Sequence, residues 1–342
     1  MFSGLHLQDG TAIEIDAVPF AAGGEASLHR IRKPAHLSGH LAKIYRSERL
    51  NDERRQRVKY LAANRPHVED TNGHKVLIWI ESLILTSGGI VGFTMHEVAG
   101  LPLERLCHSG HMKSLHADWM KFDWSSSEWQ GARVKLCFNI AAALHNLHSL
   151  GRYVLADMKP ENIIVRTNGL ISLIDLDSVG VIENGRLLFT PPVATPDYTP
   201  PEGRDMARGA EAATEAWDRF SLAVILYRVL CGIHPFTGSC LPPYENCCSC
   251  VDKMQAGLFP HSPHVRRTYR VVPPPHGRFA QLKPAVQSLF LRCFGDGHGN
   301  PRLRPSASEW CEVLMRRRLP SIKRRAIALN AEDYKPTPPV YR

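Results

Sequence analysis

The feature that most constrains this chain is a short polar run followed by a hairpin pattern. The run reads Asp157-Met158-Lys159-Pro160-Glu161-Asn162, and Asp175 follows thirteen positions after Asn162. Two short apolar stretches, 163–165 and 171–174, lie between them and are split by Asn168-Gly169, which favours a tight β-hairpin. A hairpin of this length brings the chain back toward its start. We therefore expect Asn162 and Asp175 to lie close together.

These side chains carry the groups that phosphoryl transfer needs, namely ligands for a divalent cation, a positive charge and an aligned hydroxyl. Asn162 and Asp175 offer oxygens that suit magnesium. Asp157 can orient or deprotonate an attacking hydroxyl, and Lys159 can neutralise the transferring group. We predict that Asp157, Lys159 and Asn162 are catalytic, and that Asn162 and Asp175 bind metal.

The apolar pattern divides the chain into a β-rich first hundred residues and a helical remainder. Strands are expected at 13–15, 41–45, 76–85 and 90–98, with one helix at 46–63. Helices are expected at 131–150, 217–231, 281–293 and 306–315 because their apolar residues recur at helical spacing. The outline is a small β-rich half joined to a larger helical half.

The polar run resembles the catalytic loop of the protein kinase family, and Asp175 resembles the metal-binding aspartate that follows it. The resemblance implies an ATP-dependent Ser/Thr protein kinase that uses Mg²⁺ or Mn²⁺ and acts on a protein substrate. It implies an α+β, bilobal fold with an N-lobe at 1–98, a C-lobe at 99–315 and a basic, Pro-rich tail at 316–342. The departures described below are typical of bacterial kinases that diverge from the eukaryotic pattern.

The resemblance also assigns residues to nucleotide binding. Lys43 resembles the strand lysine that pairs the α- and β-phosphates. The stretch 21–26 lies where the Gly-rich loop should be, and the stretch 95–98 resembles the hinge that binds adenine. In the 46–63 helix, Glu53 is the preferred partner of Lys43, with Glu48 and Gln56 as alternatives. The predicted nucleotide-binding residues are Gly23, Gly24, Lys43, Glu53, Met95, His96 and Val98.

Three later positions resemble structural landmarks of the family. Glu202, in Thr199-Pro200-Pro201-Glu202, resembles the glutamate that closes the activation segment, and Arg304 resembles its arginine partner. Asp218 resembles the buried aspartate that braces the catalytic-loop backbone. We expect these three residues to be structural.

Two departures bear on activity. Leu155-Ala156 replaces the His-Arg pair whose arginine grips an activation-loop phosphate, so we expect no switching by phosphorylation. Substitution of Thr190, Thr195 or Thr199 should then change activity only a few-fold. Asp177 replaces the glycine of the D-F-G element, which either stiffens the loop or adds a ligand for a second metal. A nucleotide-binding pseudokinase scaffold and a small-molecule kinase of the same fold stay open as alternatives.

Composition limits the possible ligands and the cellular location, but it does not identify a function. The net charge of +9 suits a negatively charged ligand, but the basic residues after Arg316 lack interleaved aromatics, which disfavours nucleic acid. No apolar stretch reaches the roughly 20 residues of a membrane span, and the N-terminus lacks a signal-peptide pattern. We expect a cytoplasmic protein with reduced cysteines, in which Cys240, Cys247, Cys248 and Cys250 do not form a zinc site. The segment 106–130 either anchors itself through aromatics or holds a regulatory partner.

Overall fold

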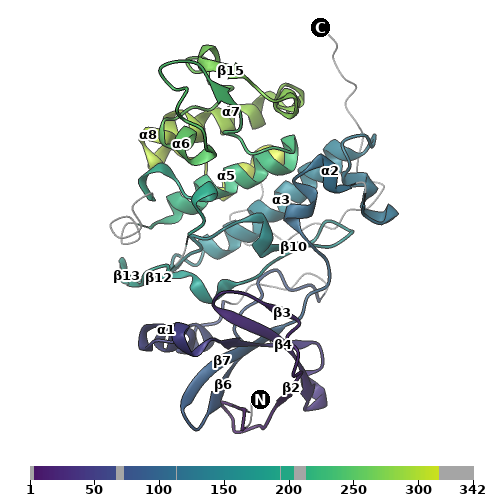
Figure 1. Cartoon of the computed structure of the whole chain (residues 1–342), viewed down its shortest axis with the longest axis vertical. Coiled ribbons are helices and arrows are strands. Elements are labelled where there is room, and N and C mark those ends of the chain that lie inside the picture. Colours follow the sequence, from purple (N-terminus) through teal and green to yellow (C-terminus); the bar gives the residue numbers. More distant parts are fainter. Residues whose placement is uncertain (1–3, 67–72, 113, 193, 204–212, 316–342) are drawn as a thin grey trace. The chain divides into compact units, whose positions relative to one another are not determined.

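The computed structural model describes residues 4–66, 73–112, 114–192, 194–203 and 213–315, and these form two compact units (Figure 1). The first unit comprises Met1–Val68, Leu77–Ala99 and Leu173–Asp177. The second comprises Glu69–Val76, Gly100–Ser172 and Ser178–Arg342. The predicted lobe boundaries stay predictions, and the predicted tail lies outside the described residues. In the described part of the chain, no helix is long and apolar enough to cross a membrane.

The first unit is built on an antiparallel sheet with the strand order β1-β6-β7-β5-β4-β2, and β3 pairs with β4. Its strands are β1 (His6–Leu7), β2 (Glu14–Ile15), β3 (Ala21–Ala22), β4 (Ala26–Lys33), β5 (His40–Tyr45), β6 (Ser82–Thr86) and β7 (Gly89–His96). Ala42 and Ile44 of β5 enter an apolar core that includes Ile84. Because side chains alternate along a strand, Lys43 points to the opposite face of the sheet.

The helix of the first unit is α1 (Asp52–Ala63), which begins later than predicted. The Asn51 side chain accepts a hydrogen bond from Arg54 N at 2.8 Å and so caps the helix at this point. Val58 and Leu61 are fully buried, and the Trp79 indole donates to the Leu61 carbonyl at 2.8 Å. Residues 76–80 are buried but are not a strand, so the predicted strand over 76–85 is wrong in its first half.

The second unit consists mainly of helices (Figure 1). Its helices are α2 (Ser109–Met112), α3 (Trp129–His148), α5 (Glu215–Cys231), α6 (Cys250–Gln255), α7 (Pro284–Phe294), α8 (Asp296–Gly299) and α9 (Ala307–Met315). Helix α3 packs against α5 and α9, and α5 also packs against α7. Both α3 and α5 are buried along most of their length, as their apolar sequences predict.

Short strands complete the second unit. They are β8 (Leu101–Pro102), β9 (Tyr153–Val154), β10 (Ile163–Val165), β11 (Ile171–Leu173), β12 (Gly180–Glu183), β13 (Arg186–Phe189), β14 (Ser239–Cys240) and β15 (Tyr269–Val271). Strand β10 lies between β11 and β8, and β12 lies between β13 and β9. The hairpin predicted around Asn168-Gly169 is confirmed as β10 and β11.

Aromatic residues anchor the 106–130 segment to the rest of the second unit. Trp119 is buried, and the Trp124 ring lies over the Arg133 guanidinium at 3.6 Å. A Cβ on Gly232, the left-handed cap of α5, would lie 2.7 Å from the Trp124 ring, so only glycine fits there. The aromatic anchoring considered from the sequence is confirmed.

The buried His276 and the half-buried His261 form a polar chain with Tyr227 in the second unit. His276 Nε2 donates to the Thr237 carbonyl at 2.9 Å, which leaves its Nδ1 to accept from the Tyr227 hydroxyl at 2.6 Å. His261 Nε2 donates in turn to the Tyr227 oxygen at 2.9 Å. Burial lowers the pKa of His261 and of His276 to about 4, and that of His234 to about 3.

Acidification should therefore destabilise the second unit. The pKa of each of these histidines is lower in the folded state than its ordinary value of 6.5. Their contribution to stability is fully present above about pH 6.5 and is lost as the pH falls toward about 4, because the unfolded chain then binds more protons. Thermal unfolding between about pH 7.5 and 5 measures this loss. The His276→Gln variant should flatten the dependence, whereas the exposed His116→Gln control should not.

Candidate active site

The predicted catalytic residues lie together on the loop of the second unit between β9 and β10. Lys159 Nζ donates to Asp157 Oδ2 at 2.7 Å. The Pro160–Asn162 turn folds the chain back, so that Asn162 Nδ2 donates to the Asp157 carbonyl at 3.2 Å. This bond uses the amide nitrogen of Asn162 and leaves the oxygen as the atom suited to a metal.

A buried carboxylate holds the start of this loop. Asp218 of α5 is fully buried and accepts hydrogen bonds from Leu155 N and Ala156 N, both at 2.8 Å. His148 Nε2 approaches the same carboxylate at 2.8 Å. Ala156 has a φ of 58°, a conformation that L-residues seldom adopt without support. The bracing role predicted for Asp218 is confirmed.

Thr195 completes a triangle with Asp157 and Lys159, two of the predicted catalytic residues. Its hydroxyl donates to Asp157 Oδ1 at 2.6 Å and accepts from Lys159 Nζ at 3.1 Å. The backbone is held as well, because Tyr198 N and Thr199 N both donate to the Thr195 carbonyl. From the sequence, Thr195 was considered only as a possible phosphorylation site. Its place just before the Thr199-Pro200-Pro201-Glu202 element was the signal that could have found it.

The end of the activation segment is held by an ion pair, as predicted. Arg304 is buried and donates through two nitrogens to the two carboxylate oxygens of Glu202, at 2.6 and 2.7 Å. Such a bidentate pair fixes orientation as well as charge. The structural pairing of Glu202 with Arg304 is confirmed.

In the first unit, Lys43 binds two carboxylates that follow the hairpin. Its Nζ lies 2.5 Å from Asp175 Oδ1 and 2.5 Å from Asp177 Oδ1, and the Tyr45 hydroxyl donates to Asp177. The segment 173–177 reaches this position through a parallel bridge between Leu77 and Leu173. The residue that replaces the expected glycine is thus a direct partner of Lys43.

The pKa values of this cluster follow from burial and charge. Burial by itself lowers the pKa of Lys43, but Asp177 and Asp175 outweigh burial and raise it above its ordinary value. Burial raises the pKa of Asp177, but Lys43 outweighs it and the pKa is lowered. Lys43 and Asp177 are therefore both charged at neutral pH, as a buried ion pair.

The comparison with known families decides the identity of this arrangement. The family model described as the protein kinase domain matches residues 106–314, which is more than half of the chain. The chain belongs to the protein kinase family. The α+β kinase fold predicted from the sequence is confirmed, with the β-rich and helical halves as the two compact units.

Relatives of this kinase come from bacteria and animals. The protein kinase YegI of Escherichia coli (strain K12) is 26% identical over 66% of this chain and 34% of its own length. Citron rho-interacting kinase of Rattus norvegicus is 35% identical over 28% of this chain and 5% of its own length. A cGMP-dependent protein kinase of Drosophila melanogaster, isozyme 2 forms cD5/T2, is 31% identical over 39% of this chain and 13% of its own length. The chain thus spans about a third or less of each of these relatives.

A solved structure supports the fold. The crystal structure of Rad53 1-466 in complex with AMP-PNP matches with a TM-score of 0.55 and 16% sequence identity. The match covers 87% of this chain and 64% of that chain. At this identity the likeness concerns the fold alone.

The prediction that Glu53 pairs with Lys43 in this kinase is wrong for this structure. Glu53 accepts from Arg57 at 2.8 Å, and its side chain is 60% exposed. Glu53 lies in the first turn of α1, one turn before Arg57, and it pairs with Arg57 along the helix instead of with Lys43. The carboxylate that Lys43 needs comes instead from Asp177.

The degenerate Gly-rich loop forms a turn between β3 and β4. Gly23 and Gly24 are exposed, and a Cβ on Gly24 would meet nothing within 4 Å. Two arginines hold the loop, because Arg46 Nε donates to the Gly23 carbonyl at 3.1 Å and Arg54 donates to Glu25 at 3.0 Å. The backbone of the two glycines is accessible, as phosphate binding requires.

The predicted hinge lies at the end of β7. Met95 is buried and pairs with Leu41 of β5, while His96 pairs with His40. Glu97 N donates to the Gly39 carbonyl at 2.8 Å, which fixes the chain just before Val98. The roles of Met95, His96 and Val98 in adenine binding stay predictions.

The cysteine cluster does not converge on a metal in the described residues. Among the described residues, the one group of three or more potential metal ligands that lie close together contains no cysteine. Cys240 is buried, Cys248 is exposed, and Cys247 and Cys250 are intermediate. The expectation that these cysteines do not bind zinc stays a prediction.

Removal of the Asp177 carboxylate should destabilise the first unit. The Asp177→Gly variant leaves buried Lys43 with one carboxylate fewer, and we expect the free energy of unfolding to fall by about 3 kcal/mol. The Tyr45→Phe variant removes only a hydrogen bond and should cost about 1 kcal/mol. Glu53→Gln should leave stability nearly unchanged. Urea unfolding measures all three, and an equal loss from Glu53→Gln would contradict the assignment of Asp177.

Proposed function

We propose that this chain is an active, ATP- and Mg²⁺-dependent protein kinase that phosphorylates serine or threonine hydroxyls of a protein substrate. The observation that carries the proposal is the triangle of Asp157, Lys159 and Thr195 on a loop that Asp218 braces. A charged acceptor and a charged donor held in this way form a preorganised site. We further propose that the chain acts in the cytoplasm, where ATP is supplied.

Asp157 would act on the attacking hydroxyl, and Lys159 on the transferring phosphoryl group. The Asp157 carboxylate can orient the substrate hydroxyl and take its proton as the new bond to phosphorus forms. The Lys159 ammonium can neutralise charge on the transferring phosphoryl group. Thr195 would hold the Asp157 carboxylate and the Lys159 ammonium in position, because its hydroxyl contacts both groups.

The residues of the chain fit a nucleotide and a magnesium ion. Asp175 is 44% exposed, and Asn162 keeps its amide oxygen out of the bond that it makes to Asp157, so both can offer oxygens to Mg²⁺. Bound magnesium would shield the charge of the phosphates. Lys43 would hold the α- and β-phosphates and Gly23 and Gly24 would cover them, with adenine against Met95, His96 and Val98. The presence of AMP-PNP in the Rad53 complex supports nucleotide use.

A nucleotide-binding scaffold without transfer activity is the second candidate. The observation that favours it is Asp177, whose carboxylate binds the same ammonium that the phosphates need. Lys43 must exchange or share this partner before it can neutralise a nucleotide. If the exchange fails, the chain binds nucleotide without transferring phosphate.

Transfer of radiolabelled phosphate to a protein or peptide pool separates these candidates. We expect activity from the wild type with Mg²⁺, and a loss of at least about 100-fold in Asp157→Ala and in Asp175→Ala. The exposed Asp118→Asn variant serves as control. Nucleotide binding without any transfer supports the scaffold, transfer to a sugar or aminoglycoside supports the small-molecule alternative, and phosphoamino-acid analysis tests the serine and threonine specificity.

Thr195 variants test the triangle itself. The sequence predicted only a few-fold effect at this position, but the structure predicts that Thr195→Ala lowers kcat by roughly tenfold or more, because Asp157 and Lys159 both lose a hydrogen bond. Thr195→Ser keeps the hydroxyl and should keep most of the activity. Steady-state kinetics with wild type and both variants decide, and full activity in Thr195→Ala would remove the triangle from the mechanism.

A further inference from the structure

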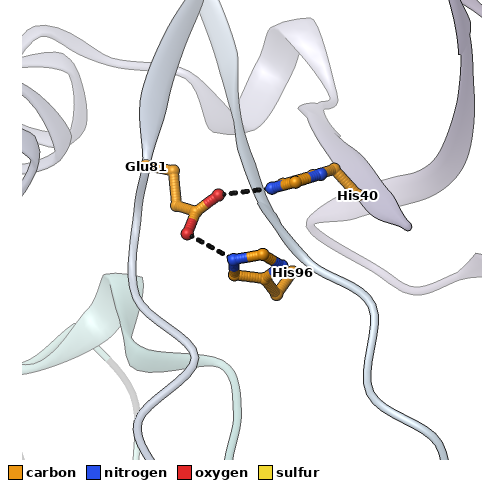
Figure 2. A group of neighbouring side chains, drawn as sticks. All are labelled: His40, Glu81 and His96. Carbon is orange, nitrogen blue, oxygen red and sulfur yellow. Dashed lines mark ion pairs between the residues drawn. The ribbon is translucent and has the colours of Figure 1, made fainter. Parts of the chain in front are cut away.

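Three potential metal ligands converge in the first unit (Figure 2). Glu81, which lies just before β6, holds one carboxylate oxygen 2.8 Å from His40 Nε2 and the other 3.0 Å from His96 Nε2. The potential ligand atoms of these three residues all lie within 4.8 Å of one another. His40 and His96 thus present the same ring nitrogen to one carboxylate.

The sheet itself places these side chains together. His40 at the start of β5 is the register partner of His96 at the end of β7. Glu81 joins them because its backbone N–H donates to the Thr94 carbonyl of β7 at 2.9 Å. His40 shares its face of the sheet with Ala42 and Ile44, whereas Lys43 points to the other face. The cluster is therefore separate from the carboxylates that bind Lys43.

The three potential ligands are largely shielded from solvent, as a bound metal ion requires. The side chains of His40, Glu81 and His96 are 14%, 16% and 30% exposed. Among the described residues, His40 Nδ1 is buried and has no hydrogen-bond partner.

Arg65 is one cation that must move away from Glu81 before a metal binds. Its guanidinium contacts the Glu81 carboxylate at 3.3 Å, and its side chain is 43% exposed. A long, partly exposed side chain can move into solvent at little cost. In a tetrahedral zinc site, bonds of about 2.0–2.1 Å separate the ligand atoms by about 3.4 Å. Small side-chain rotations would open the observed 2.8 and 3.0 Å contacts to that spacing.

We propose that His40, Glu81 and His96 bind a zinc ion that clips β5 and β7 to the start of β6. Two imidazoles and one carboxylate suit zinc and neighbouring transition metals, whereas magnesium and calcium prefer oxygen ligands alone. The fourth position would be taken by water. The role that we propose is to join the strands, and it does not depend on the kinase activity.

Zinc binding to the full chain, after removal of any affinity tag and of bound metal, tests this site. Isothermal titration should show one zinc bound at the site, and saturating zinc should raise the Tm on the order of 5 °C. His40→Ala, His96→Ala and Glu81→Gln should each weaken zinc binding at least about tenfold, as loss of one ligand requires. The exposed His36→Ala variant and the combined Cys247→Ser, Cys248→Ser and Cys250→Ser variant should bind zinc like the wild type.

Cobalt substitution keeps the proposal testable if a ligand variant fails to fold. Wild-type protein loaded with Co²⁺ should show visible bands of a nitrogen- and oxygen-ligated ion without a thiolate charge-transfer band. A thiolate band would assign the metal to cysteines, and zinc binding that persists in all three ligand variants would place it at another site; either result would overturn the proposal. No binding and no change in Tm for the folded wild type would overturn it too.

Discussion

The buried carboxylate of Asp218 is the interaction on which the candidate active site depends. It sits on α5, inside the core of the second unit, and binds the amides of Leu155 and Ala156. Hydrogen bonds to a charged acceptor contribute about 1.5–3 kcal/mol each when they are buried. They hold Ala156 in a strained conformation, and that conformation turns the chain so that Asp157 meets Lys159 and Thr195. The packing of one helix thereby determines the geometry of the loop.

The second arrangement of note is the ion pair at Lys43. In the pattern that the sequence resembles, a helix glutamate orients this lysine, but here Asp177 binds it from the segment that also carries Asp175. One short stretch of chain thus holds both the predicted metal ligand and the partner of the lysine. The α1 helix is released from that task, and its first turn can point Glu53 to solvent. This links the altered D-F-G element to the orientation of α1.

The sequence predicted the landmarks of the site well where local chemistry decided them. The polar run from Asp157 to Asn162, the hairpin after it and the pairing of Glu202 with Arg304 all required only residue type and spacing. The predicted helices were wrong mainly at their ends. For example, Asn51 caps α1, so this helix begins later than the predicted 46–63 range. The Glu53 assignment was wrong, and the contacts of Thr195 were not predicted, for another reason. Both depend on which side chains meet across the fold, and a one-residue change in helical phase redirects a side chain by about 100°.

By itself, the sequence determined the family, the β-rich and helical halves and the identity of the catalytic loop, because these follow from periodicity and from residues at fixed spacing. The tertiary structure alone decided that Asp177 binds Lys43, that Thr195 joins Asp157, and that His40 and His96 share Glu81. These contacts join residues between 15 and 134 positions apart. Their distances depend on strand register and helix packing, which the burial of the two cores sets and which no local pattern encodes.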